Sequence, residues 1–268
     1  MIAAGGPGGR ARAAAGLHLL LLAGTGEAAD LARALAGMPG LRVTASLAGV
    51  TRAPRPLGVP VRSGGFGGDD GFARYLAQER VDAVLDATHP FAARISWRTA
   101  RICAAAGVAH AQLLRPGWTA GAGDRWTWLD REEAAAEVIP PGARVFLATG
   151  RQTLERFANL SGRHLIVRQI DAPAGPFPFA GGEYLVGRPP FSTADEVALF
   201  RRVGVDWLVV KDAGGAASRS KLDAARQIGL PVALIRRPPQ PPGHRVADVG
   251  AALDWVRGLV AQAAPHGF

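Results

Sequence analysis

Short apolar runs of strand length alternate with helix-forming segments along most of this chain. In the first part, the predicted strands lie over residues 17–23, 41–47, 59–62, 81–85 and 109–114, and the helices over 27–37, 70–79 and 91–106. In the second part, the predicted strands lie over 144–148, 165–169, 184–186, 207–210 and 232–235, and the helices over 151–158, 193–203, 218–228 and 247–262. This alternation indicates parallel sheets with helices on both faces. We therefore expect an α/β protein with two doubly wound parallel-sheet domains and a cleft between them.

The two series meet at a stretch rich in glycine and proline, R-P-G-W-T-A-G-A-G-D-R-W, over residues 115–126. Such a composition is typical of a linker between domains. We expect a first domain over 17–118 and a second over 119–268, with residues 1–16 as a disordered N-terminal tail. Two domains that face each other form a cleft, which is a common place for a ligand.

The formal net charge is +9, from 31 basic and 22 acidic residues. The basic residues are scattered, without the stripe that marks a nucleic-acid surface, so we expect no nucleic-acid partner. All of them except Lys211 and Lys221 are arginine. A bias in composition accounts for much of this charge, and a polyanionic small-molecule ligand is the functional alternative. Because arginine is used elsewhere, the two lysines are candidates for a specific role.

Other features concern the cellular setting. No segment has the roughly 20 apolar residues that a membrane-spanning helix needs. The apolar run near the N-terminus is interrupted by His18, unlike a signal peptide. The single cysteine, Cys103, permits no intrachain disulfide and fits a reducing compartment. We expect a cytoplasmic protein without a membrane partner, as a monomer or a small homo-oligomer.

A glycine turn follows the first predicted strand, in L-L-L-L-A-G-T-G-E-A-A-D. Its glycines and Ala29 match the G-x-G-x-x-A pattern at the start of a helix, where backbone amides and the helix dipole favour a pyrophosphate. Gly24, Thr25, Gly26 and Glu27 are therefore candidate cofactor-binding residues. A plain tight turn is the alternative.

The end of the second predicted strand carries Ser46. A site selective for NADH has Asp or Glu near this position to bind the ribose hydroxyl groups. The loop that follows offers Thr51 and Arg52 as donors suited to a 2′-phosphate. If the first domain binds a dinucleotide, the sequence favours NADPH. An ordinary polar loop is the alternative.

A polar cluster ends the fourth predicted strand, in D-A-T-H-P-F-A over residues 86–92. The carboxyl ends of parallel strands line the ligand crevice of an open sheet, so Asp86, Thr88 and His89 are candidate site residues. A helix cap, with His89 only packing, is the alternative.

Three more turns carry candidate residues. S-G-G-F-G-G over 63–68 permits close approach of the backbone to a flat ligand, or is a flexible loop. The turns F-L-A-T-G-R-Q and K-D-A-G-G each follow a predicted strand. The lysines and glycine amides of the second turn and just after it are suited to bind a carboxylate, and solvated surface lysines are the alternative. The candidates in these turns and just after them are Gly65, Phe66, Gly67, Arg151, Lys211, Gly214, Gly215 and Lys221.

The sequence lacks a Cys and His metal-ligand cluster, a G-x-x-x-x-G-K-[ST] loop and a G-x-S-x-G turn. We expect no metal site, no metal-dependent hydrolysis and no nucleotide-triphosphate cleavage.

These motifs together resemble those of the precorrin-6A reductase family. They are, in order, A-G-T-G-E-A, S-L-A-G, G-G-F-G-G, D-A-T-H-P-F-A, G-R-Q and K-D-A-G-G with Lys221, and the resemblance covers nearly all of residues 17–240. It implies two Rossmann-like domains, NADPH as hydride donor, and reduction of one double bond of the precorrin-6A macrocycle to precorrin-6B in cobalamin biosynthesis. The chain departs from the family pattern at Ala23, Val50 and Ala213, and Arg52 is expected to replace the arginine that often precedes Thr51.

With this resemblance, each candidate residue receives an expected role. The expected NADPH-binding residues are Gly24, Thr25, Gly26, Glu27, Ser46, Thr51, Arg52 and Thr88. The expected binding residues for the polycarboxylate tetrapyrrole substrate are Gly65, Phe66, Gly67, Asp86, His89, Arg151, Lys211, Gly214, Gly215 and Lys221. His89 is the candidate catalytic residue, since imidazole titrates near neutrality and a proton must follow the hydride, and a bound water is the alternative donor.

Two other functions stay open on the sequence. One is an NADPH-dependent dehydrogenase or epimerase that acts on another substrate. The other is a non-catalytic module that binds a nucleotide or a tetrapyrrole.

Overall fold

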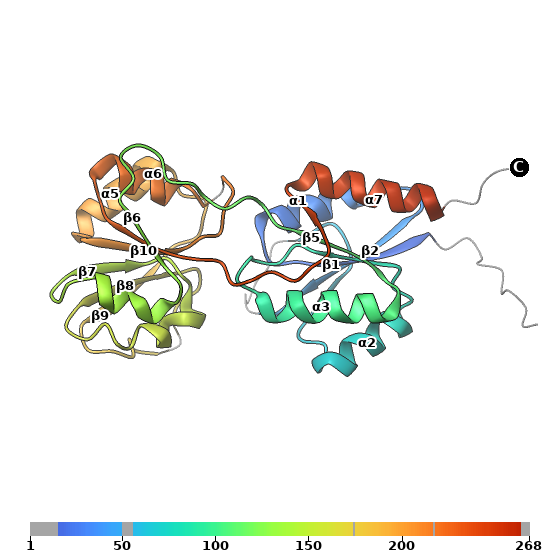
Figure 1. The fold of residues 1–268 in the computed structure, drawn as a ribbon, viewed down its shortest axis with the longest axis horizontal. Helices are drawn as coiled ribbons and strands as arrows, with labels where there is room; N and C mark the ends of the chain where they lie inside the picture. Colours follow the sequence, from blue (N-terminus) through green and yellow to red (C-terminus); the bar gives the residue numbers. More distant parts are fainter. Residues whose placement is uncertain (1–15, 50–55, 174, 217, 264–268) are drawn as a thin grey trace, which may run out of the picture.

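The computed structural model describes residues 16–49, 56–173, 175–216 and 218–263. They form two six-stranded sheets in which all the described strand pairs are parallel. Each sheet has helices on both faces, and the two sheets lie side by side as separate domains (Figure 1). The expected α/β architecture with two parallel-sheet domains is confirmed. The expected tail over 1–16 lies, apart from Gly16, outside the described residues.

The first sheet has the order β12-β5-β4-β1-β2-β3. Its strands are β1 (Leu17–Leu22), β2 (Leu41–Leu47), β3 (Val61–Ser63), β4 (Ala83–Asp86), β5 (Ala109–Leu113) and β12 (His244–Val246). Alternate leucines of β1 point to opposite faces, because successive side chains of a strand do so. Leu19 and Leu21 belong to the core cluster with α1 (Gly26–Leu35) and α7 (Val249–Ala263).

Leu20 and Leu22 belong to the core on the opposite face, with Phe72 and Leu76 of α2 (Gly68–Gln78) and Ile102 of α3 (Ala93–Ala106). Helices α1 and α7 therefore cover one face of the first sheet, and α2 and α3 cover the other (Figure 1).

The second sheet has the order β6-β11-β10-β7-β8-β9. Its strands are β6 (Trp126–Leu129), β7 (Arg144–Leu147), β8 (His164–Gln169), β9 (Gly182–Val186), β10 (Trp207–Lys211) and β11 (Val232–Ile235). One face packs on α5 (Thr193–Val203) and α6 (Ser220–Ile228), and the other on η1 (Glu132–Ala134), α4 (Ala135–Val138) and η2 (Arg151–Phe157). A capping box of Ser192 and Asp195 fixes the start of α5.

The second sheet is built from the consecutive strands β6 to β11, whereas the first sheet takes its sixth strand, β12, from beyond them in the sequence. The chain leaves the first domain after β5, and β6 then pairs with β11 of the second sheet. After β11 the chain returns, and β12 pairs with β5 of the first sheet. The structure therefore differs from the expected boundary at 118/119, because β12 and α7, over residues 244–263, lie in the first domain.

The helical prediction was less accurate in short segments. The segment predicted as a helix over 151–158 is the 3₁₀-helix η2, and the helix predicted from residue 91 begins at Ala93. Strands β6 and β12, of four and three residues, were not predicted. No helix among the described residues is long and apolar enough to span a bilayer.

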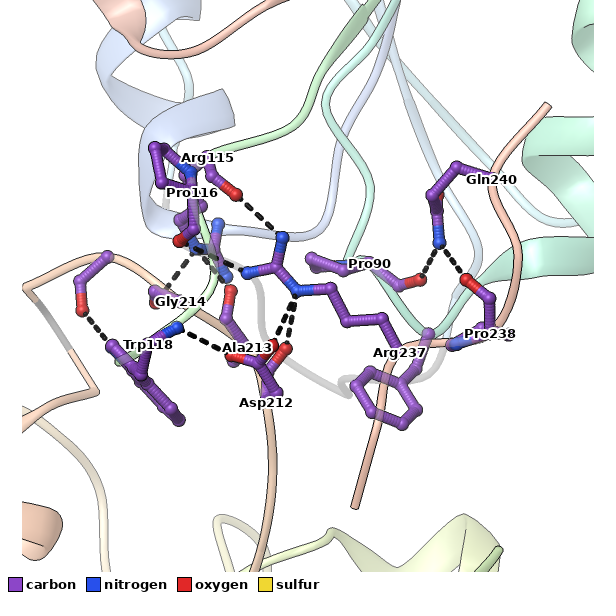
Figure 2. A network of polar contacts seen from close by, with 12 residues as sticks. Pro90, Arg115, Pro116, Trp118, Asp212, Ala213, Gly214, Arg237, Pro238 and Gln240 are labelled. Carbon is purple, nitrogen blue, oxygen red and sulfur yellow. Dashed lines mark hydrogen bonds and ion pairs between the residues drawn. The ribbon is translucent and has the colours of Figure 1, made fainter. Parts of the chain in front are cut away.

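A network of polar contacts joins the two segments that cross between the domains (Figure 2). Arg237 Nε donates to the carbonyl of Asp212 at 2.8 Å, and its Nη1 donates to the carbonyl of Arg115 at 2.7 Å. The Asp212 carboxylate accepts from the backbone N–H of Trp118 at 3.0 Å. Arg115 Nη1 lies 3.0 Å from Glu27 Oε1, at the start of α1. These contacts hold both crossing segments against the turn after β10 and against the first domain.

Candidate functional site

A cavity of about 930 Å³ lies between the carboxyl edges of the two sheets. Its first-domain wall comes from the ends of β1, β2, β3 and β4, and its second-domain wall from the ends of β7, β8 and β10. Ligands of open parallel sheets bind at this edge. The cavity brings together Gly24, Ser46, Gly65, Phe66, Thr88, His89, Arg151 and Lys211 of the predicted site residues.

The glycine turn after β1 reaches the cavity through Gly24. Gly24 has φ +146°, a backbone conformation that disfavours other residues, and a Cβ built there would meet nothing within 4 Å. Thr25 is the N-cap of α1: its hydroxyl accepts from Ala28 N at 3.2 Å and donates to the carbonyl of Ala87 at 2.9 Å. Thr25, Gly26 and Glu27 do not line the cavity.

The ends of β2 and β3 hold a guanidinium that sequence reasoning missed. Arg62 is the register partner of Ser46, and its Nη1 donates to Ser46 Oγ at 2.7 Å and to the carbonyl of Gly64 at 3.0 Å. Its Nη2 donates to the carbonyl of Gly65 at 2.9 Å, and its Cζ lies 3.8 Å from the centre of the Phe66 ring. Arg62 thus fixes both Ser46 and the S-G-G-F-G-G loop. Thr51 and Arg52 lie outside the described residues.

Asp86 stabilises the turn after β4, next to the cavity lining. Its Oδ1 accepts from Thr88 N at 3.0 Å and from Thr88 Oγ1 at 2.6 Å. The side chain is 1% exposed, and its Oδ2 has no hydrogen-bond partner among the described residues. Asp86 is not part of the cavity lining, whereas Thr88 and His89 are.

His89 lies between positive groups of both domains. Burial, followed by the charges of Arg115, Lys211 and Arg237, lowers its pKa to about 4. The imidazole is therefore neutral near pH 7 in the unliganded protein. Phe91 N donates to Nδ1 at 3.3 Å, so the proton of the neutral ring is on Nε2.

Lys211 supplies a cation on the second-domain side. Its Nζ lies 3.6 Å from Glu132 Oε1 and donates to Thr153 Oγ1 at 3.3 Å. Burial lowers the pKa of Lys211, and the charge of Glu132 acts against this shift. The ammonium also lies 5.2 Å from the centre of the Phe91 ring, which follows His89 by two residues.

The end of β8 contributes two charged residues that sequence reasoning did not single out. Arg168 lines the cavity, and its two Nη atoms each lie 2.7 Å from an oxygen of Glu196. Asp171 is the one carboxylate among the described lining residues, and it lies 3.6 Å from Arg188. Arg168 is the last but one residue of β8, and Asp171 follows the strand by two residues, so their position at a strand end was the available signal.

Several predicted substrate-binding residues lie elsewhere. A Cβ at Gly214 would be 2.2 Å from the carbonyl of Pro116, and one at Gly215 would be 2.6 Å from Arg115 Cδ, so both glycines serve the packing of the crossing segment. Gly67 is the N-cap of α2. Lys221 donates to the carbonyl of Ser218 at 2.8 Å, and burial lowers its pKa to about 8. None of these four lines the cavity.

The donor set of the site is that of an organic ligand. The described residues contain no group of three or more His, Cys, Asp or Glu side chains able to hold a metal ion. What the cavity offers is a glycine turn and a serine on one side, and Arg151, Arg168 and Lys211 on the other. Such walls can hold an anionic cofactor beside a ligand that carries carboxylates.

A family model, two related sequences and one solved structure all indicate the same family. Residues 18–257 match the model of the family described as precorrin-6x reductase CbiJ/CobK. A precorrin-6A reductase of Rhodococcus erythropolis is 46% identical, with 89% of this chain and 97% of that protein covered. The precorrin-6A reductase of Rhodobacter capsulatus is 43% identical, with 93% and 99% covered. A solved structure described as CobK precorrin-6A reductase has a TM-score of 0.86 at 42% identity, with 90% of this chain and 96% of that chain covered.

Proposed function

This chain belongs to the precorrin-6x reductase CbiJ/CobK family and is an oxidoreductase of cobalamin biosynthesis, and we propose that it uses NADPH to reduce one carbon–carbon double bond of precorrin-6A, giving precorrin-6B. The observation that carries this proposal is the cavity between the two sheets, with a glycine turn on one wall and three cations on the other. A cofactor and a polycarboxylate macrocycle can meet there.

The residues of the first domain fit a phosphorylated dinucleotide. Gly24 leaves space at the turn before α1, where a pyrophosphate is favoured. The end of β2 carries Ser46 rather than a carboxylate, and Arg62 lies against its hydroxyl. The absence of a negative charge at this position favours the cofactor with a 2′-phosphate. When bound, NADPH supplies the hydride, and the protein supplies orientation and charge.

The second domain supplies the contacts for the substrate in this proposal. Arg151, Arg168 and Lys211 bind carboxylates at the rim of the macrocycle. Arg168 is held by Glu196, which fixes the direction of its guanidinium. The substrate then lies between this wall and the turn that carries His89.

His89 is the residue that we propose to place a proton next to the reacting carbon. Its Nδ1 accepts from Phe91 N, so Nε2 is the atom that can donate. Burial, followed by the charges of Arg115, Lys211 and Arg237, lowers its pKa, and substrate carboxylates beside these cations would act against the part of the shift that the charges cause.

The test is the oxidation of NADPH under anaerobic conditions with precorrin-6A, without it, and with NADH in place of NADPH. We expect oxidation that requires precorrin-6A and is faster with NADPH, and a product with two more hydrogen atoms by mass spectrometry. Oxidation of NADPH with another substrate, and none with precorrin-6A, would favour a dehydrogenase or epimerase of that substrate. Binding of either ligand without oxidation would favour a non-catalytic module.

The cellular setting is also part of the proposal. We expect a cytoplasmic enzyme that is a monomer or a small homo-oligomer, with no nucleic-acid partner. Gel filtration of the purified chain with light scattering tests the oligomeric state.

A further inference from the structure

A second cavity of about 850 Å³ lies on the outer side of α3, and the proposed reaction does not use it. Its main wall is α3, which presents Arg94, Trp97, Arg98 and Arg101. These residues are three or four positions apart, so they share one face of the helix. The start of α2, with Asp69, and the crossing segment over 241–243 form the other walls. Helices α2 and α3 lie side by side on this face of the first domain (Figure 1).

Trp97 gives this cavity an aromatic surface. The side chain is 45% exposed, which is unusual for the largest apolar residue. Its Nε1–H donates to the carbonyl of Pro239 at 3.0 Å, so the edge of the indole ring is held by the crossing segment. A ring fixed at its edge and open to the cavity can stack on a flat ligand at little cost in side-chain entropy.

The arginines give the cavity a positive charge that the one carboxylate of its described lining, Asp69, neutralises only in part. Arg101 forms an ion pair with Asp69, the one carboxylate among the described lining residues. Arg94 and Arg98 form no ion pair with a described carboxylate, and Arg98 Nε is buried without a hydrogen-bond partner in the described part of the chain. Two guanidinium groups beside an exposed indole fit a flat molecule with carboxylates at its rim.

This cavity is next to the cleft between the domains. Ile95 and Arg98 line both, so one turn of α3 is the common wall. The guanidinium of Arg98 lies 5.9 Å from the centre of the Phe66 ring, and Phe66 lines the cleft. A ligand held on the outer side of α3 is therefore close to the place where the reaction occurs.

We propose that the cavity on the outer side of α3 is a second binding site for a planar polycarboxylate tetrapyrrole, with the ring stacked on Trp97 and its carboxylates on Arg94 and Arg98. This inference rests on the proposed function for the choice of ligand class. The macrocycle of that reaction combines a partly conjugated ring and several carboxylates, whereas an acidic protein segment would use the arginines without needing the open face of Trp97. The site holds tetrapyrrole beside the cleft and raises its local concentration there.

The test uses uroporphyrin, a stable planar polycarboxylate tetrapyrrole, as the probe. Its binding to the full chain is followed by equilibrium dialysis and by quenching of tryptophan fluorescence. We expect two sites per chain in the native protein. In Arg94→Gln/Trp97→Phe we expect the site on α3 to weaken about tenfold or more, because a charge-assisted contact is lost and the phenyl ring has a smaller stacking face and no N–H to hold it to Pro239. In Lys211→Gln we expect the site in the cleft to weaken instead.

Arg74→Gln is the matched control, because Arg74 is an exposed arginine of α2 that does not line the cavity. We expect this control to keep both sites. One site per chain in the native protein, or two unchanged sites in Arg94→Gln/Trp97→Phe, would overturn the proposal. The proposal would also be overturned if Arg94→Gln/Trp97→Phe lost the binding of an acidic peptide but kept the binding of uroporphyrin.

A kinetic measurement on the same preparations separates this proposal from the proposed function. At low ionic strength we expect Arg94→Gln/Trp97→Phe to lower kcat/KM for precorrin-6A severalfold, and added salt to reduce the difference. If the native protein reduces precorrin-6A but has one uroporphyrin site, only this inference fails. If the native protein does not oxidise NADPH with precorrin-6A, the proposed function fails.

Discussion

At the scale of single residues, the sequence predicted site residues at positions that the structure divides between the lining of the cavity and the packing of the chain. His89 and Lys211 lie at the cavity, as their positions at strand ends predicted. Gly214 and Gly215 follow the same kind of strand, yet their backbones are in contact with the crossing segment. The sequence cannot separate these cases, because the atoms that a side chain would meet come from residues about 100 positions away.

His89 makes stability depend on pH in a defined direction. Its folded pKa of about 4 is below the unfolded value of 6.5, so the neutral form is favoured in the fold. The stability that this provides is present above about pH 6.5 and is lost as the pH falls toward 4. Between pH 6.5 and pH 4, we expect the free energy of unfolding in urea to fall less in His89→Asn than in the native protein, with a difference on the order of 2 kcal/mol. The same slope in both proteins would contradict the assignment, and an NMR titration of the imidazole measures its pKa directly.

At the scale of elements, most strands and helices were predicted within a few residues. The apolar runs of β1, β4, β7 and β10 are buried along nearly their whole length, which makes the pattern strong. Strand β12 has two exposed residues of three, so its sequence carries no such pattern. The sequence also did not predict the pairing of Ser46 with Arg62, because the register between β2 and β3 is set by the whole sheet.

Arg62 links two strand ends and is predicted to control cofactor binding. Its guanidinium donates at once to Ser46 Oγ and to the carbonyls of Gly64 and Gly65, and lysine cannot reproduce this geometry. We expect Arg62→Lys and Arg62→Gln to raise the KM for NADPH about tenfold with a smaller effect on kcat. Arg80→Gln, at an exposed position after α2, is the control. An equal effect of Arg62→Gln on the KM for precorrin-6A would argue against a role at the cofactor.

At the scale of the whole molecule, the second domain is inserted between β5 and β12 of the first domain. The first sheet includes a strand, β12, that follows all six strands of the second sheet along the chain. The order of predicted elements does not show this insertion, because two successive domains and one domain inserted into another have nearly the same pattern along the chain. The consequence is a pair of crossing segments, and their contacts set how the two walls of the cavity face each other (Figure 2).

Arg115 is the residue through which this arrangement can be tested. Its side chain is 11% exposed, pairs with Glu27 in the first turn of α1, and donates through Nε to the carbonyls of Ala213 and Gly214 at 2.7 and 3.0 Å. Removal of one partner of a buried ion pair is costly, so we expect Arg115→Gln to destabilise the protein by about 3 kcal/mol. We also expect kcat/KM for precorrin-6A to fall at least tenfold, because the cofactor wall and the Lys211 wall lose their alignment.

A control and a second variant separate alignment from stability. Arg163→Gln removes a guanidinium that donates to the carbonyls of Ile139 and Ala136 inside the second domain, so we expect it to lower stability and leave kcat/KM nearly unchanged. Glu27→Gln should have a much smaller effect in the Arg115→Gln background than alone, because the two residues act as a pair. The loss of the Arg115 charge should also raise the pKa of His89, which an NMR titration detects. Additive effects of the two variants, together with an unchanged His89 titration, would show that Arg115 does not couple the domains.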